Sequence, residues 1–249
     1  MRALLLPGIV TPAAVAYERL VPALGPEVDA RPKELEVYAG PEPPPGYSLE
    51  VEMDGVLRAA DDAGWERFHL VGYSGGGAVA ASLAASRPER LLSLGLLEPA
   101  WTGNGGLSET EAKARAEFDA LDGLEPREFL ATFARLQLRP GVEPPPPPDP
   151  PPSWMATRPA AIAALTLAFR TDELSAESLR RFDRPVYHAL GGRSRPELYG
   201  EQSARLARLF PDFTEEVFEE RHHFDPPHRA EPERLAASLL AHWRRAEAG

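Results

Sequence analysis

The sequence contains no cysteine, so disulfide bonds, thiol nucleophiles and zinc sites built on thiolates are excluded. Positive charge is also scarce, because 27 Lys and Arg stand against 38 Asp and Glu, for a formal net charge of -11. Nucleic acids and anionic membranes are bound by basic surfaces, so this balance predicts neither as a partner. No apolar run approaches the roughly 20 residues of a membrane-spanning helix. We therefore expect a cytoplasmic protein with a small-molecule partner, and a homo-oligomer is compatible with the sequence.

Short apolar runs alternate along the chain with segments of helical character. The expected strands are Ala3–Leu6, Leu35–Tyr38, Phe68–Val71, Leu91–Leu97, Val186–Leu190 and Thr214–Phe218. The expected covering helices are Glu50–Ala63, Gly76–Ser86, Tyr199–Leu209 and Pro232–Arg245. Some of the strand runs are apolar on both faces, as buried parallel strands require. The alternation predicts an α/β fold, with a mostly parallel sheet of about six strands flanked by helices.

The strand pattern stops between Trp101 and Arg184. We predict that residues 102–183 are a helical insertion between two strands, and that residues 1–101 and 184–249 form the core. The proline-rich stretch 143–152 lacks backbone donors, so it is expected to be a stiff spacer inside the insertion. It is also a candidate ligand for a proline-recognition domain. Ala160–Arg170 is apolar on nearly all faces, which predicts a lid that packs over a pocket.

The stretch 72–76 reads Gly-Tyr-Ser-Gly-Gly and matches the pattern G-x-S-x-G. It lies between a strand-like run and an alanine-rich, helix-like one. A serine on such a turn is held in a strained backbone conformation, and glycines two residues to each side give the turn its room. The first amides of the helix then point to where negative charge develops in acyl transfer. Ser74 is therefore the candidate nucleophile.

An activated serine needs an imidazole to accept its proton and a carboxylate to orient that imidazole. Three of the six histidines lie in predicted strands or on the last helix: His69, His188 and His242. The segment 221–228, Arg-His-His-Phe-Asp-Pro-Pro-His, is a loop between the last strand and the final helix, from which a side chain can reach the serine. The candidates in this loop are His222, His223 and His228.

The G-x-S-x-G turn, the late histidine loop and the inserted helical region together resemble the α/β-hydrolase superfamily over essentially the whole chain. In that superfamily the chain order is Ser, then Asp or Glu, then His. The histidine is commonly followed by Phe or Met and a proline-bearing turn. The segment 223–226, His-Phe-Asp-Pro, matches this pattern best. The resemblance therefore implies His223 as the base, with His222 and then His228 as alternatives.

The acid is where the sequence departs from the common superfamily pattern. A Gly-x-x-Asp-Pro turn usually follows the penultimate strand, but residues 192–196 read Gly-Arg-Ser-Arg-Pro. Arg195 stands where the aspartate is expected, and a guanidinium cannot stabilise an imidazolium. Some α/β-hydrolases supply the acid from the end of the strand after the serine helix, where this chain has Glu98. We predict Glu98 as the acid; the weaker alternatives are Glu197, Asp225 and Asp54.

The oxyanion hole that the resemblance implies consists of two backbone N–H groups. The first belongs to Gly75, next to the serine. The second belongs to Ile9, with Val10 as the alternative, in the loop after the first strand. Members of the superfamily often have His-Gly in this loop, and this chain has Pro7-Gly8. Because only the backbone donor matters for charge stabilisation, the hole is compatible with this sequence, and the resemblance implies neither a metal nor another cofactor.

The resemblance implies a serine hydrolase that forms an acyl-serine intermediate. Carboxylic esters of small hydrophobic molecules are the expected substrates, because activated esters are the easiest acyl donors. Amidases, peptidases, thioesterases, carbon–carbon bond hydrolases and perhydrolases share the serine and stay open, since one fold hosts many reactions. The departure at Arg195 motivates a different alternative, a ligand-binding protein that keeps the fold without catalysis.

Overall fold

The computed structural model describes residues 1–121, 123–146 and 148–248. Its centre is a six-stranded sheet in the order β2-β1-β3-β4-β5-β6, and every neighbouring pair is parallel. The strands are β1 (Arg2–Leu6), β2 (Asp29–Pro32), β3 (Phe68–Tyr73), β4 (Leu91–Leu97), β5 (Val186–Gly191) and β6 (Phe213–Phe218). The expected α/β fold with about six parallel strands is confirmed.

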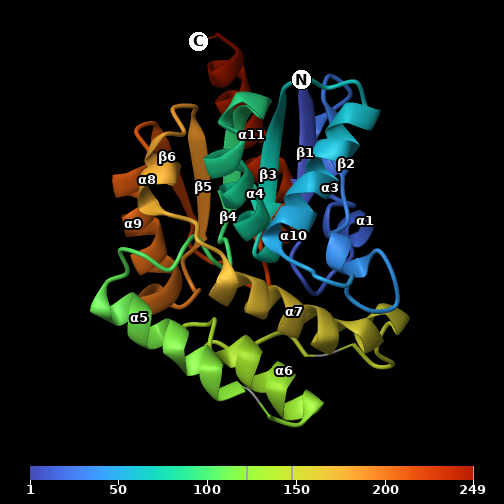
Figure 1. Ribbon diagram of the computed structural model, residues 1–249, viewed down its shortest axis with the longest axis vertical. Helices are drawn as coiled ribbons and strands as arrows, with labels where there is room; N and C mark the ends of the chain where they lie inside the picture. The colour runs from blue at the N-terminus through green and yellow to red at the C-terminus, as the bar shows by residue number, and fades with distance from the viewer. Residues whose placement is uncertain (122, 147, 249) are drawn as a thin grey trace.

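Helices lie on both faces of this sheet and below the carboxyl ends of its strands (Figure 1). They are α1 (Ala13–Ala16), α2 (Leu20–Leu24), α3 (Leu49–Asp62), α4 (Gly75–Ser86), α5 (Glu109–Ala116), α6 (Pro126–Arg135), α7 (Arg158–Thr171), α8 (Ala176–Arg180), α9 (Glu201–Leu209), α10 (Pro227–Ala230) and α11 (Pro232–Ala248). Short 3-10 helices span Glu36–Tyr38, Pro88–Arg90, Glu117–Leu121 and Ser153–Thr157, and a π-helical turn spans Pro196–Gly200.

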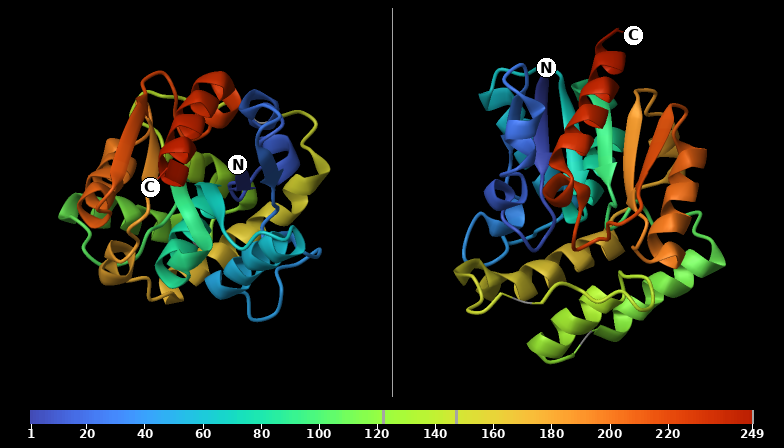
Figure 2. Two further views of the ribbon diagram at one scale, coloured as in Figure 1. Left: turned by 90° about the horizontal axis from the view of Figure 1, so that it is seen from above. Right: turned by 180° about the vertical axis from the view of Figure 1, so that it is seen from behind.

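Strand β1 contributes to two separate apolar cores, because alternate residues of a strand point to opposite faces of the sheet. Leu4 and Leu6 belong to the core formed with α3, α4 and α9. Ala3 and Leu5 belong to the core formed with α2 and α11. Figure 2 shows α11 in front of the sheet when the molecule is seen from behind. Since both faces of the sheet are buried, its central strands are apolar at nearly every position.

The second strand along the chain is Asp29–Pro32, so the prediction of a strand at Leu35–Tyr38 was wrong. The carboxylate of Glu52, which is fully buried on α3, accepts hydrogen bonds from the N–H groups of Glu36 at 2.7 Å and Val37 at 2.9 Å. These donors are therefore not available to a neighbouring strand, and the segment turns into a 3-10 helix. The apolar spacing of the segment did not reveal this distant carboxylate.

Residues 102–183, called the inserted segment below, carry α5, α6 and α7 between β4 and β5. In Figures 1 and 2, α7 runs across the lower ends of the strands, which are their carboxyl ends; α6 lies beneath α7, and α5 lies to one side of it. Pro147 of the proline-rich stretch lies outside the described residues. Among the helices that are described, none has both the length and the apolar character needed to cross a membrane.

The burial pattern generates a first prediction, which compares two leucines. Leu94 in β4 is fully buried, whereas Leu167 on α7 is 59% exposed. We expect Leu94→Ala to lower the free energy of unfolding by about 2 to 5 kcal/mol, because it leaves a cavity in a packed core. The same change at Leu167 is expected to cost less than about 0.5 kcal/mol. Denaturant unfolding followed by circular dichroism measures both, and equal losses would contradict the assigned core.

Candidate active site

Ser74 lies between β3 and α4 with a backbone φ of 51°. This conformation is costly for a residue with a Cβ, and the surroundings hold it in place. The Ser74 N–H donates to the carbonyl of Leu97 at 3.1 Å, and its carbonyl accepts from the N–H of Ala100 at 2.9 Å. A Cβ on Gly72 would lie 2.2 Å from the carbonyl oxygen of Gly76, so the turn has no room for a side chain there. The turn presents Ser74 at the carboxyl edge of the sheet.

His223 lies in the loop after β6, and its imidazole bridges Ser74 and Glu98. Its Nε2 is 3.0 Å from Ser74 Oγ, and its Nδ1 is 3.2 Å from Glu98 Oε2. The three residues are between 2% and 6% exposed, so water competes little for these contacts. A carboxylate beside Nδ1 favours the tautomer with its proton on Nδ1. Nε2 is then the acceptor for the serine hydroxyl.

Glu98 follows β4 and is tied to the next strand, β5. Its Oε1 accepts a hydrogen bond from the N–H of Gly191 at 2.9 Å, and its own N–H donates to the carbonyl of Ala189 at 3.2 Å. Like Ser74, Glu98 is a non-glycine residue with a positive backbone φ, here 42°. The carboxylate therefore reaches the imidazole at the end of β5, which is where the superfamily resemblance places an aspartate.

The other acids considered from sequence have different partners. Arg195 forms a two-pronged ion pair with Glu117, with hydrogen bonds of 2.8 and 2.9 Å, and lies 3.7 Å from Glu197. Asp225 pairs with an arginine of its own loop at 2.6 Å. Asp54 is exposed on α3. Of the four acids weighed from sequence, the structure brings Glu98 to the imidazole.

The two alternative histidines have different environments from His223. The Nδ1 of His222 accepts the N–H of Phe224 at 3.2 Å. His228 is fully buried between Tyr17 and Tyr73, with ring centres 5.1 and 4.7 Å away. In the part of the chain that the structure describes, neither imidazole is hydrogen-bonded to the serine.

The amides of Gly75 and Ile9 lie close together beside Ser74. A Cβ on Gly75 would be 3.5 Å from the Ile9 nitrogen. The loop that carries Ile9 is held by its carbonyls: that of Ile9 accepts from the hydroxyl of Tyr38, and that of Val10 accepts from Arg158 Nε at 2.7 Å. Within the described residues neither amide donates to a protein group, so both are free to bind an oxyanion.

A cavity of about 350 Å³ opens beside Ser74. Its walls are largely apolar, and Trp101 and Phe169 stack in one of them with ring centres 5.4 Å apart. The inserted segment supplies much of this lining: Leu107, Phe118, Phe133, Ile162, Leu165 and Phe169. The cavity therefore suits an apolar group attached to the reacting carbon.

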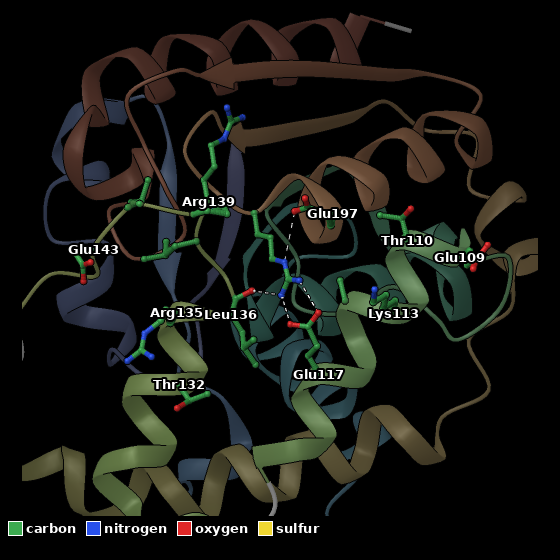
Figure 3. A pocket seen from close by; sticks show the side chains of 16 residues that line it. Glu109, Thr110, Lys113, Glu117, Thr132, Arg135, Leu136, Arg139, Glu143 and Glu197 are labelled. Atoms are coloured by element: carbon green, nitrogen blue, oxygen red, sulfur yellow. Dashed lines mark hydrogen bonds and ion pairs between the residues drawn. The ribbon is translucent and has the colours of Figure 1, made fainter.

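A second and larger hollow, of about 750 Å³, contains neither the serine nor the histidine. Figure 3 shows its charged lining, which includes Lys113, Glu117, Arg135, Arg139 and Glu197. We therefore place the chemistry in the smaller cavity. Among the residues that the structure describes, no three or more His, Asp or Glu side chains are grouped to hold a metal ion.

Two tyrosines beside His223 were not predicted as site residues. The ring of Tyr199 stacks on the imidazole, with ring centres 4.7 Å apart and an interplanar angle of 16°. The hydroxyl of Tyr73 donates to the carbonyl of His223. The sequence could have indicated Tyr73, because it is adjacent to the serine. It gave no indication of Tyr199, because the residues around Tyr199 predict only the start of a helix.

The parallel sheet, the strand–serine–helix turn and the helices inserted over the carboxyl edge are those of the α/β-hydrolase fold. Among solved structures, a thermophilic esterase from Thermogutta terrifontis superimposes with a TM-score of 0.73. It is 19% identical in sequence, and the match covers 99% of this chain and 90% of that one. No family model matches the chain.

Two curated proteins match part of the sequence. The dihydrolipoyllysine-residue acetyltransferase component of the acetoin cleaving system of Cupriavidus necator is 36% identical over 109 residues. The lipase LipV of Mycobacterium tuberculosis is 34% identical over 97 residues. Each match covers 39% of this chain, and the matches span 29% and 37% of the length of these relatives.

The environment of His228 generates a prediction about acid stability. Burial lowers the pKa of this imidazole to about 3, and neither ring nitrogen has a hydrogen-bond partner among the described residues. In the unfolded chain its pKa is about 6.5, so the unfolded state binds the extra proton between these two values. The free energy of unfolding should therefore fall, as the pH drops from about 6.5 towards 3, by up to about 1.4 kcal/mol per pH unit from this residue.

Urea unfolding of the wild type and of His228→Leu at several pH values tests this prediction. The slope of stability against pH should be shallower in the variant, because leucine cannot take up a proton. Part of the slope should remain, since burial also lowers the pKa of His69 and of His242 to about 4. Identical slopes in both proteins would show that His228 does not contribute.

Proposed function

We propose that the protein is a serine hydrolase that forms an acyl-serine intermediate and cleaves carboxylic esters of small hydrophobic molecules. The supporting observation is the continuous set of contacts from Ser74 Oγ through His223 to Glu98, at 3.0 and 3.2 Å, beside two free amides. One curated relative is named a lipase and one solved neighbour an esterase, and both names agree with ester hydrolysis.

In the acylation step, His223 Nε2 takes the hydroxyl proton of Ser74 while Oγ attacks the ester carbonyl carbon. The carbonyl oxygen becomes an oxyanion, which the N–H groups of Gly75 and Ile9 stabilise. The imidazolium then gives its proton to the departing alcohol as the ester C–O bond breaks. In the second half, His223 takes a proton from water as the water oxygen attacks the acyl carbon. The imidazolium then returns this proton to Ser74 Oγ as the acyl C–O bond breaks and the acid leaves.

Glu98 fixes the orientation of His223 and stabilises its positive charge during both halves of the reaction. The Gly191 N–H holds the second carboxylate oxygen, so the carboxylate cannot rotate away from Nδ1. The inserted segment serves as a lid, because α7 crosses the carboxyl edge of the sheet and its side chains form a wall of the cavity. A lid of this kind excludes water and strengthens the electrostatic interactions beneath it.

Labelling with a fluorophosphonate probe tests whether Ser74 is activated. We expect the wild type to be labelled and Ser74→Ala to be unlabelled, with turnover of p-nitrophenyl butyrate in the variant reduced by at least about 10⁴-fold. Wild-type protein that is folded but not labelled would contradict a nucleophilic serine. That outcome would favour a ligand-binding role.

The acid is tested by Glu98→Gln, which keeps the size of the side chain and removes its charge. We expect kcat to fall by about 10³- to 10⁴-fold, because the amide neither stabilises the imidazolium nor selects the productive tautomer. Glu197→Gln is the matched control, since Glu197 was a rival acid, and it should change kcat by less than about 3-fold. A larger loss in Glu197→Gln than in Glu98→Gln would refute this assignment.

The cavity volume predicts a preference for short acyl chains. With about 350 Å³ beside Ser74, the site has room for a small acyl group but not for a long one in full. We expect kcat/KM for p-nitrophenyl butyrate to exceed that for the palmitate by at least about 10-fold. Phe169→Ala should lower the ratio of kcat/KM for the butyrate to that for the palmitate, because it removes a large side chain from the cavity wall and makes room for a longer acyl group. A higher kcat/KM for the palmitate would exclude a small-substrate enzyme.

A further inference from the structure

One stretch of chain, residues 191–199, runs from the end of β5 towards α9 and contacts both His223 and Glu98. At its start, the Gly191 N–H donates to Glu98 at 2.9 Å. At its end, the Tyr199 ring stacks on His223 at 4.7 Å between ring centres. A displacement of this stretch would therefore disturb the acid and the base together.

The middle of the same stretch is fastened to the inserted segment by Arg195. Its N–H donates to the carbonyl of Gln137 at 3.0 Å, and its guanidinium bonds to both carboxylate oxygens of Glu117 and to the carbonyl of Leu136 at 3.3 Å. Figure 3 shows Glu117 and Leu136 converging on one side chain through these dashed contacts. A bidentate arginine–carboxylate pair fixes geometry as well as distance, so Arg195 acts as a latch between core and inserted segment.

The inserted segment also holds Tyr199 directly. The Tyr199 hydroxyl donates to Gln137 Oε1 at 2.7 Å, and Gln137 Nε2 donates to the carbonyl of Phe133 at 2.9 Å. Tyr199 and Gln137 are 2% and 3% exposed, so water cannot replace either partner. Burial raises the pKa of Tyr199 well above its ordinary value, and the hydroxyl therefore stays a donor. Tyr199 lies in a π-helical turn, Pro196–Gly200, a feature that is frequent at functional sites.

We propose that Tyr199 is a positioning residue for His223, and that Gln137 and Arg195, which tie the stretch 191–199 to the inserted segment, keep Tyr199 in place against the imidazole. This inference rests on the proposed function. The stacked ring limits rotation of the imidazole, and its electron-rich face stabilises the imidazolium that forms during acyl transfer. Arg195, at the position where the superfamily resemblance expects the acid, thus binds the inserted segment to the core.

Tyr199→Phe is the sharpest test, because it removes the hydroxyl that binds Gln137 and keeps the stacked ring. With p-nitrophenyl butyrate we expect kcat to fall about 3- to 10-fold while KM changes less than about 2-fold. Gln137→Leu should act similarly, and the double variant should lose less than the product of the two single effects, because both remove one interaction. Tyr187→Phe is the control: Tyr187 is 3% exposed, against 2% for Tyr199, its hydroxyl donates to Glu216 at 2.7 Å outside the site, and kcat should not change.

A measurement without turnover is the NMR spectrum of protein with labelled histidine. In Tyr199→Leu we expect the His223 ring resonances to lose the ring-current shift of the stacked tyrosine. In Arg195→Met the His223 ring resonances should broaden, or shift part of the way from their wild-type positions to those in Tyr199→Leu. The reason is that this variant loses the contact with the inserted segment but keeps the tyrosine ring. The His242 resonances provide an internal reference, since this residue packs on Tyr187 rather than on Tyr199.

Two results would overturn the inference: equal kcat in Tyr199→Phe and Tyr187→Phe, or His223 resonances that are unchanged in Tyr199→Leu. Failure of the proposed function gives a different result, which is wild-type protein that no fluorophosphonate labels. The NMR comparison then decides by itself whether Tyr199 positions the imidazole. Thermal melting of each variant identifies any loss that comes from unfolding.

Discussion

The parallel register of β3, β4 and β5 is the constraint on which the site depends. Tyr73 pairs with Leu97, and Leu97 pairs with Ala189. The residues that follow, Ser74 and Glu98, therefore leave their strands side by side at one edge of the sheet. The carboxyl ends of parallel strands lie at the same edge of a sheet. A serine after one strand and a carboxylate after the next therefore become neighbours in space although they are distant in the sequence. The histidine loop after β6 then closes over both.

This arrangement has an energetic cost that the rest of the fold offsets. Ser74 and Glu98 are the two non-glycine residues with positive φ among those described. Backbone strain of this kind costs on the order of 1 to 3 kcal/mol per residue and persists only where the surroundings enforce it. Here two apolar cores pack on the strands from both faces. The serine turn is held by backbone hydrogen bonds, one donated to the Leu97 carbonyl and one accepted from the Ala100 N–H. The stability of the sheet thus maintains the geometry of the site.

The acid that we propose, Glu98, follows β4, and this placement leaves the turn after β5 for another contact. In the common superfamily pattern an aspartate occupies this turn, and the position is committed to the histidine. In this chain the position holds Arg195, which binds Glu117 of the inserted segment. The carboxylate of Glu98 is held by the backbone N–H of Gly191, the last residue of β5, just before this turn. As a result, the core and the inserted segment meet at the place where Glu98 and His223 are supported.

The sequence by itself determined the features that depend on local chemistry. Apolar runs gave five of the six strands, the pattern around Ser74 gave the turn, and the loop 221–228 gave a short set of histidines. The tertiary structure decided which groups meet: Ser74 and His223 are 149 residues apart in the chain, Glu98 and His223 are 125 apart, and Gln137 and Tyr199 are 62 apart. The second strand was mispredicted for the same reason. The buried carboxylate that binds the backbone N–H groups of the segment 35–38 belongs to Glu52, on another element. Local spacing sets how a segment folds, but packing of distant segments in a dry interior selects the partner of each buried polar group.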